Sequence, residues 1–229
     1  MFAGFIHEID SDITQFQQLL TKSSQSDPLR LISVFGLAIT LFQRHGLLNQ
    51  RKDLDKSIFH FTESILLPPR SWPLGHSPLI LQALFFLASA LLKRSNESNQ
   101  LEDATYAAKY LRHLRDQPHA AFRFPRHAVT AMLVDVLAFQ VKLEAGNAVQ
   151  NIEEMAVLCH ELLTSDASDC DTTRPITVFI EAVFSIIRLS VPDQPSNQVI
   201  EFLRATRKHK PNLLGADYAL VLCLCLRYL

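Results

Sequence analysis

The strongest constraint on the fold is a pair of helical segments that recurs along the chain. In each pair the first segment is apolar around most of its circumference, and the second opens with an aliphatic residue followed by an acid. These openings are Leu54-Asp55, Leu101-Glu102, Ile152-Glu153 and Ile200-Glu201, at intervals of 47, 51 and 48 residues. One helical hairpin cannot bury its apolar faces alone, so a period of this length predicts a stack of hairpins, an α-solenoid.

Local signals delimit the helices. Asp27 is suited to cap a helix that starts with Pro28, and Gly46 follows a long apolar run. An N-terminal helix precedes these signals, with one apolar face and a predicted break near Ser11. The other expected helices are Pro28 to His45, Asp53–Leu67, Leu79–Arg94, Leu101–Arg115, His127–Leu143, Ile152–Leu163, Ile176–Leu189, Val199–Arg207 and Leu213 to the chain end.

The expected fold is therefore all-α: a solenoid of about four helical hairpins, with an N-terminal helix and an unpaired C-terminal helix. The hairpins cover roughly residues 28–68, 78–117, 126–164 and 174–208. Polar stretches near 21–27, 94–100, 164–174 and 192–198 are short enough to be connections rather than linkers. We therefore expect a single domain over residues 1–229.

Composition and charge exclude several classes of fold and partner. Leucine occurs 36 times and glycine only 6 times, which suits long helices and not a turn-rich β fold. The net charge of −1 argues against nucleic acid as a partner, because phosphate binding depends on clustered Lys and Arg. The charge-free stretch from Ser71 to Leu92 is interrupted by prolines, so no membrane span is expected. Without a secretory signal or a metal-binding or redox cysteine spacing, a cytoplasmic location is expected.

Several segments resemble the tetratricopeptide (TPR) pattern. They are Phe35-Gly36-Leu37-Ala38 with Asp53-Leu54-Asp55-Lys56-Ser57-Ile58, and Leu87-Ala88-Ser89-Ala90-Leu91 with Ala107-Ala108. In TPR proteins such small residues let helices pack closely. The stretches 109–115 and 152–160 are similar to a fungal branch of long-period TPR-like proteins, some of which carry a caspase-like CHAT domain after the repeats. No caspase-like His/Cys segment is recognisable here, so the resemblance implies a scaffold and not a protease.

Candidate catalytic groups have simpler interpretations. Cys159 and His160 are neighbours, which places their side chains about 100° apart on a helix. Cys223 and Cys225 lie in an apolar helix at a spacing unsuited to shared metal ligation. Acidic pairs such as Glu153-Glu154 are expected in first helical turns, where the helix dipole stabilises them. We therefore expect no enzyme activity, no cofactor and no metal.

A basic stretch is the first candidate binding site. It consists of Lys109, Arg112, Arg115, Arg123 and Arg126. The first three follow helical spacing, and such a stripe would suit an acidic or phosphorylated peptide. The alternative is an ordinary solvated helix face.

A groove lined by the first helices of the pairs is the second candidate. Polar residues recur there at near-helical spacing: Arg30, Ser33, Thr40 and Arg44; Gln82, Ser89 and Lys93; Asp135 and Lys142; Arg174, Thr177, Glu181, Ser185 and Arg188. Aligned stripes would form a mixed-charge groove for an extended or helical segment of a partner. The alternative is that each stripe is only the wet side of an amphipathic helix.

We therefore expect a non-catalytic protein–protein interaction scaffold that binds a protein or peptide. One alternative is the regulatory sensor region of a caspase-like CHAT protease whose catalytic part is missing. Another is a helical small-ligand carrier or enzyme with an interior pocket. The apolar C-terminal segment from Tyr218 to Leu226 adds a possible site of self-association.

Overall fold

The computed structural model describes residues 2–24, 27–67, 78–118, 124–143, 147–164, 172–188, 197–210, 212–213 and 215–228. All regular secondary structure in these ranges is α-helical. The described helices are α1 (Phe2–Lys22), α2 (Pro28–Leu48), α3 (Arg51–Leu66), α4 (Pro78–Ser98), α5 (Leu101–Arg115), α6 (Arg126–Lys142), α7 (Ala148–Thr164), α8 (Thr173–Arg188), α9 (Asn197–His209) and α10 (Ala216–Tyr228).

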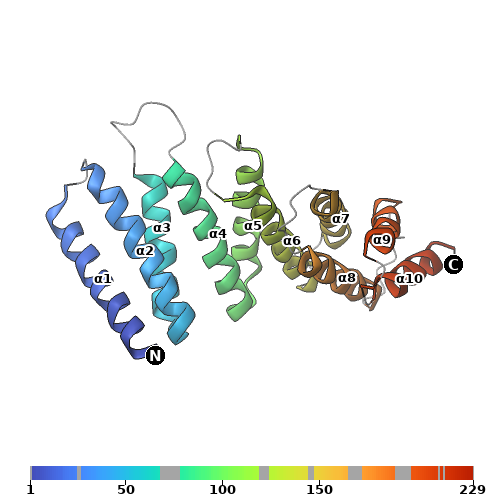
Figure 1. Ribbon diagram of the computed structural model, residues 1–229, viewed down its shortest axis with the longest axis horizontal. Coiled ribbons are helices and arrows are strands. Elements are labelled where there is room, and N and C mark those ends of the chain that lie inside the picture. The colour runs from blue at the N-terminus through green and yellow to red at the C-terminus, as the bar shows by residue number, and fades with distance from the viewer. Residues whose placement is uncertain are drawn as a thin grey trace.

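The helices follow one another from one end of the molecule to the other (Figure 1). Each helix from α1 to α7 packs against the next helix in the chain, and α9 packs against α10. In addition, α6 packs against α8, and α7 packs against α9. We refer to α2, α4, α6 and α8 as first helices and to α3, α5, α7 and α9 as second helices.

The α2–α3 and α4–α5 pairs share one architecture at an offset of 50 residues, since α2 begins at Pro28 and α4 at Pro78. Asn49 and Asn99 follow the two first helices with left-handed φ angles of 52° and 53°. Asparagine is one of the few residues that tolerate this conformation, which ends a helix and turns the chain.

This offset corrects the register predicted from the acidic openings. The offset aligns Asp53 with Asp103, and Leu54 with Ala104. The prediction that Leu54-Asp55 matches Leu101-Glu102 is therefore wrong. An aliphatic residue before an acid is common near helix starts, so it marks a helix without fixing its register.

Several helix ends also differ from the sequence-based expectation. α1 is continuous through Ser11, so the predicted break is absent. α2 continues past Gly46, and α4 continues to Ser98 through residues expected to form a connection. The hydroxyl of Ser98 donates to the carbonyl of Arg94 at 2.6 Å, which stabilises that last turn. α7 begins at Ala148, so Glu153-Glu154 lies beyond its first turn.

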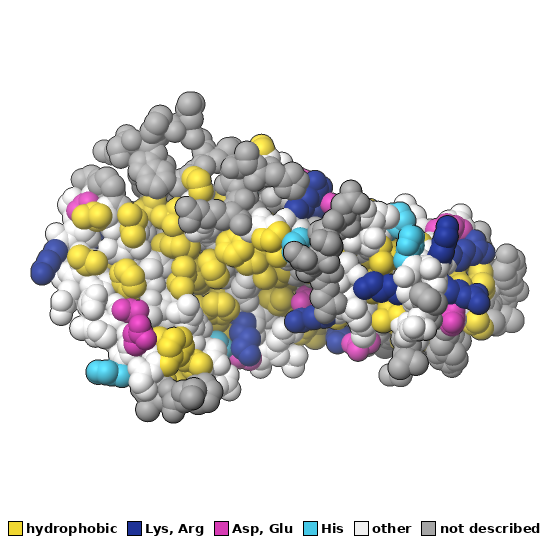
Figure 2. Space-filling model, in the orientation of Figure 1, with side chains coloured by type: hydrophobic (Ala, Val, Ile, Leu, Met, Phe, Trp, Pro, Cys, Tyr) yellow, Lys and Arg dark blue, Asp and Glu magenta, His cyan; other side chains and the backbone are white. Residues whose placement is uncertain are grey.

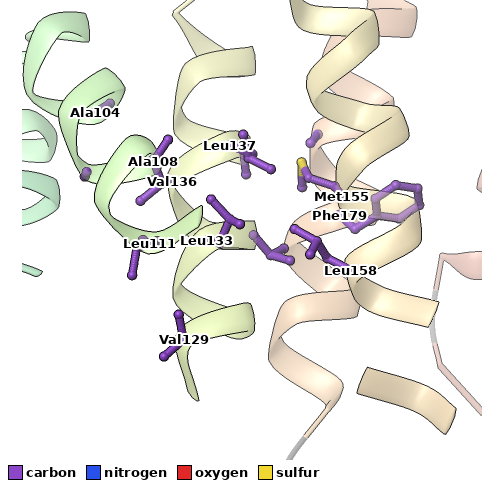
Figure 3. Packing of buried hydrophobic residues seen from close by; sticks show 14 of the residues in the cluster. Ala104, Ala108, Leu111, Val129, Leu133, Val136, Leu137, Met155, Leu158 and Phe179 are labelled. Carbon is purple, nitrogen blue, oxygen red and sulfur yellow. The ribbon is translucent and has the colours of Figure 1, made fainter. Parts of the chain in front are cut away.

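A continuous apolar core joins the helices from α2 to α10. Figure 3 shows part of this core, with Leu111 on α5, Leu133 on α6, and Leu137 on the side of α6 that faces α7 and α8. These three leucines are fully buried. A smaller cluster, centred on Ile9, Ile13, Leu37 and Leu41, attaches α1 to α2.

α2 and α4 are long and apolar enough to cross a membrane, by length and composition. Half of each apolar window is nevertheless buried inside the protein. α1 and α3 pack against α2, and α3 and α5 pack against α4. Their hydropathy is therefore explained by burial between neighbouring helices.

The C-terminal helix α10 packs against α8 and α9. Ala219, Leu220 and Cys223 are buried in that contact, whereas Val221 is exposed. The side chains from Cys225 to Leu229 lie outside the described residues. One side of this apolar helix therefore contributes to the core.

Candidate interaction surface

Arg44, predicted to line the groove, instead joins three helices. Its Nε and Nη2 donate to the two carboxylate oxygens of Asp53 on α3, both at 2.7 Å. Its Nη1 donates to Asp10 of α1 at 2.7 Å. The hydrogen bonds to Asp53 raise the pKa of the Arg44 guanidinium, against the opposing effect of burial. This side chain is committed to holding α1, α2 and α3 together.

The rest of the predicted α2 stripe also faces neighbouring helices. Ser33 and Thr40 are only 3% and 5% exposed. Their hydroxyls donate to the carbonyls of Leu29 and Gly36, one turn earlier, which lets them lie in an apolar interface. Arg30 pairs with Glu63 of α3 at 3.0 Å. The expectation that this stripe lines a groove is therefore wrong for α2.

The solvent-facing side of α2 is apolar instead. Leu29 is 61% exposed and Ile32 is 51% exposed. Ile39, two turns after Ile32, is partly exposed, and Gln43 follows on the same side. Figure 2 shows hydrophobic side chains gathered over the α2–α4 half of the molecule. Sequence reasoning missed this side because α2 is apolar nearly all round.

On α4, the predicted stripe does reach the surface. Gln82 and Ser89 are partly exposed, and Lys93 is exposed with an ion pair to Glu97 at 3.4 Å. The Ser89 hydroxyl donates to the carbonyl of Phe85 at 2.9 Å and lies 3.3 Å from the sulfur of Met132 on α6. This contact places the exposed sides of α4 and α6 next to each other.

On α6 and α8, the predicted residues come together as ion pairs. Arg174 contacts Asp135 at 3.0 Å, and Lys142 lies 3.9 Å from Glu181. Burial raises the pKa of the Asp135 carboxyl, and the positive charges of Arg174 and Lys142 oppose that effect. Thr177 is exposed between these pairs, and the hydroxyl of Ser185 donates to the carbonyl of Glu181. The side chain of Arg188 lies outside the described residues.

Together these side chains define the first-helix face. It changes character along the molecule, from apolar on α2 through small polar groups on α4 to paired charges on α6 and α8. Its members are Leu29, Ile32, Ile39, Gln43, Gln82, Ser89, Lys93, Met132, Asp135, Lys142, Arg174, Thr177 and Glu181.

The predicted basic stretch is largely neutralised by α7. Arg112 donates to both carboxylate oxygens of Glu154, at 2.9 and 2.6 Å. Arg115 and Arg126 both contact Glu161, at 2.9 and 3.0 Å. Lys109 is exposed, and Arg123 lies outside the described residues. These arginines therefore cross-link α5, α6 and α7, which leaves little net positive charge for an anionic partner.

Cys159 and Cys223, the cysteines whose side chains the structure describes, are packed in the core. Cys159 is fully buried, and its thiol lies 3.7 Å from the carbonyl of Pro175. Burial raises the pKa of Cys159, and it raises the pKa of Cys223 to about 11. His160 is exposed, away from the buried thiol. Within the described ranges, no group of three or more His, Cys, Asp or Glu residues could hold a metal ion.

Compared with known protein families and with curated proteins, the chain matches no family model and no curated protein. The TPR resemblance and its CHAT-bearing branch therefore stay predictions. The exposed faces of the helices, and the partners of each charged side chain, provide the basis for assigning a function.

Proposed function

We propose that the chain is a TPR-like α-solenoid of four hairpins that acts as a non-catalytic protein–protein interaction scaffold. The recurrence of one helix pair at a 50-residue offset supports the solenoid. In such an arrangement each second helix packs between two first helices, as α3 does between α2 and α4. The first helices are then free to present a shared surface to a partner.

The observation that carries the binding proposal is the exposed apolar end of the first-helix face. Leu29 and Ile32 are large apolar side chains, and each is more than half exposed. Polar residues of the same helix, Ser33 and Thr40, are buried instead. Contiguous exposed apolar surface marks interaction sites, and covering it contributes roughly 25 cal/mol for each Å² removed from water. The partner segment is therefore expected to be apolar where it meets α2.

The paired charges at the other end provide specificity. Asp135 with Arg174, and Lys142 with Glu181, present both signs of charge within one short stretch. A partner with complementary charges can bind there, whereas a segment of one sign meets repulsion from half of the surface. The face thus favours a segment with an apolar end and a mixed-charge end.

A peptide-display selection against the full chain tests this function. Selected peptides should bind the parent chain and lose about tenfold or more in affinity to Ile32→Glu, since apolar anchors dominate such interfaces. Lys52→Glu, an exposed change on the second helix α3, is the matched control and should bind like the parent. Both variants should melt near the parent temperature. Equal losses in both variants would contradict the proposal.

A further inference from the structure

A pocket of about 510 Å³ opens between the second helices α3 and α5. Its floor is formed by α4, through Leu87, Leu91 and Arg94. At about 100° per residue, Leu91 lies on the side of α4 opposite to Gln82 and Ser89. The pocket is therefore separate from the first-helix face, and a ligand here would not compete with a partner there.

Among the residues that the structure describes, the inner end of the pocket offers no free cation. Arg94 donates to both carboxylate oxygens of Asp103, at 2.6 and 2.7 Å, and to Asp55 at 3.3 Å. The carboxylates of Asp103 and Asp55 thus accept the hydrogen bonds that the Arg94 guanidinium donates. An anionic ligand would meet carboxylates at this end, so the pocket disfavours a phosphate or an acidic side chain.

The wall formed by α5 is aromatic and acidic. Tyr106 and Tyr110 lie one turn apart and both line the pocket, with Glu102 one turn before them. Neither tyrosine hydroxyl makes a hydrogen bond, and Glu102 makes no ion pair, with any residue that the structure describes. Aromatic faces next to an unpaired carboxylate are the groups that attract an organic cation.

The equivalent positions in the preceding pair have the opposite chemistry. Fifty residues earlier, Glu102, Tyr106 and Tyr110 correspond to Lys52, Lys56 and His60. The two pairs share their Arg–Asp contacts and their buried positions, so packing alone does not demand the tyrosines. The acidic and aromatic character is therefore specific to the pocket between α3 and α5.

We propose that this pocket binds an arginine side chain of an extended peptide. The aliphatic part of the arginine lies on Ile58, Leu87 and Leu91, and its guanidinium stacks on the tyrosine rings and donates to Glu102. Arginine suits the site better than lysine, because its planar, weakly hydrated group stacks on aromatic rings and binds carboxylates through two donors.

Exposed apolar residues beside the pocket fit the neighbours of that arginine. Thr62 lines the pocket, and Phe59 and Leu66 stand on the same side of α3, three residues before it and four after it. Phe59 is 64% exposed and Leu66 is 73% exposed. A peptide with leucines flanking its arginine would cover both residues.

The test uses matched fluorescent pentapeptides, Gly-Leu-Arg-Leu-Gly and the same peptide with citrulline in place of arginine. Citrulline has nearly the shape of arginine without its charge. Fluorescence anisotropy with the full chain should show at least about tenfold weaker binding of the citrulline peptide, as for loss of a charge-assisted contact. Equal affinity for the two peptides, or saturable binding of neither, would overturn the proposal.

Matched variants localise the site. Tyr106→Leu and Glu102→Gln should each weaken the arginine peptide by about threefold to tenfold, the range of a cation–π contact or an exposed charge pair. Lys56→Leu and Lys52→Gln change the corresponding positions of the preceding pair and should leave affinity unchanged. Equal effects of the two sets would place the peptide elsewhere. Ile32→Glu should not change this binding, which separates it from the proposed function of the first-helix face.

Discussion

Arg94 and Asp103 are joined by two hydrogen bonds, from Nε at 2.6 Å and from Nη2 at 2.7 Å, across the turn between α4 and α5. Arg44 and Asp53 make the same contact between α2 and α3. Each arginine also reaches the preceding helix, through Asp55 for Arg94 and Asp10 for Arg44. In each of these two pairs, one arginine side chain thus joins three successive helices.

Removing one partner of the Arg94–Asp103 contact should lower the stability of the fold. Arg94→Met leaves the buried carboxylate of Asp103 without its partner, so the free energy of unfolding should fall by about 3 kcal/mol or more in urea titrations. Adding Asp103→Leu should recover part of the loss, because no uncompensated charge then remains. Lys93→Met, an exposed neighbour, is the control and should change stability by less than about 0.5 kcal/mol. Additive losses in the double variant would contradict this explanation.

Gly36 leaves room for the ring of Phe16. A Cβ at residue 36 would lie 2.5 Å from Cζ and 2.6 Å from Cε1 of Phe16. Gly36→Ala should therefore destabilise by about 1 kcal/mol, since overpacking outweighs the helical preference for alanine. In a Phe16→Leu background the same change should become neutral or stabilising, because the ring tip is gone. The same loss in both backgrounds would show that the ring contact is not the cause.

The position that corresponds to Gly36 in α4, fifty residues later, holds a large side chain instead of a glycine. Phe86 stands where Gly36 does, and it stacks on Phe61 of α3 with ring centroids 5.9 Å apart and planes 7° apart. Phe86 also contacts Phe35 at 6.1 Å. The large residue at this position is therefore packed among other aromatic rings, where Gly36 has the ring tip of Phe16 near it.

Asp135 should make stability depend on pH. Burial raises the pKa of its carboxyl above the ordinary value of 3.8, so the folded chain holds this proton more tightly than the unfolded chain. The contribution to stability is therefore present at low pH and is lost as pH rises through the raised pKa. Asp135→Asn should be more stable than the parent at pH 7, with the difference vanishing near pH 3. Thermal melts at both pH values check this, and a less stable Asn variant at pH 7 would show that Arg174 outweighs burial.

The buried thiols should be unreactive in the folded chain. Burial raises the pKa of Cys159 and of Cys223, so the thiolate, which is the reactive form, is scarce near pH 8. In a Cys170→Ser/Cys225→Ser variant, a chromogenic disulfide reagent should detect no fast thiol until guanidinium chloride unfolds the chain. A rapidly reacting thiol in the native variant would contradict the burial of these side chains.

Much of the helical framework is predictable from local signals. Asp27 does cap α2, with its carboxylate accepting from the amide of Leu29 at 2.9 Å, and Pro28 opens the helix. The predicted bounds of α5, Leu101 to Arg115, agree with the structure. Such features depend on residues within one turn of each other, which is why a single sequence contains enough information to place them.

The candidate sites were less predictable because they depend on contacts between distant residues. Arg112 and Arg115 do lie on one side of α5, as predicted. Glu154 and Glu161, more than forty residues later in the chain, pair with them and neutralise their charge. On α2, polar residues suggested the exposed side, whereas Ser33 and Thr40 satisfy their hydroxyls within the helix and are buried. The tyrosine pocket has a sequence signal, the exchange of basic for acidic and aromatic residues at a 50-residue offset, which becomes visible only in the correct register.

Methyl NMR of the full chain, titrated with a peptide from the display selection, tests the proposed scaffold function most directly. The methyl groups of Ile32, Ile39 and Met132 should shift in a saturable, concerted manner, because they lie on the first-helix face. Ile176, which is fully buried, serves as the internal reference and should stay unchanged. Saturable shifts confined to second-helix methyl groups, with Ile32 and Ile39 unaffected, would contradict the assignment of the first-helix face as the partner-binding surface.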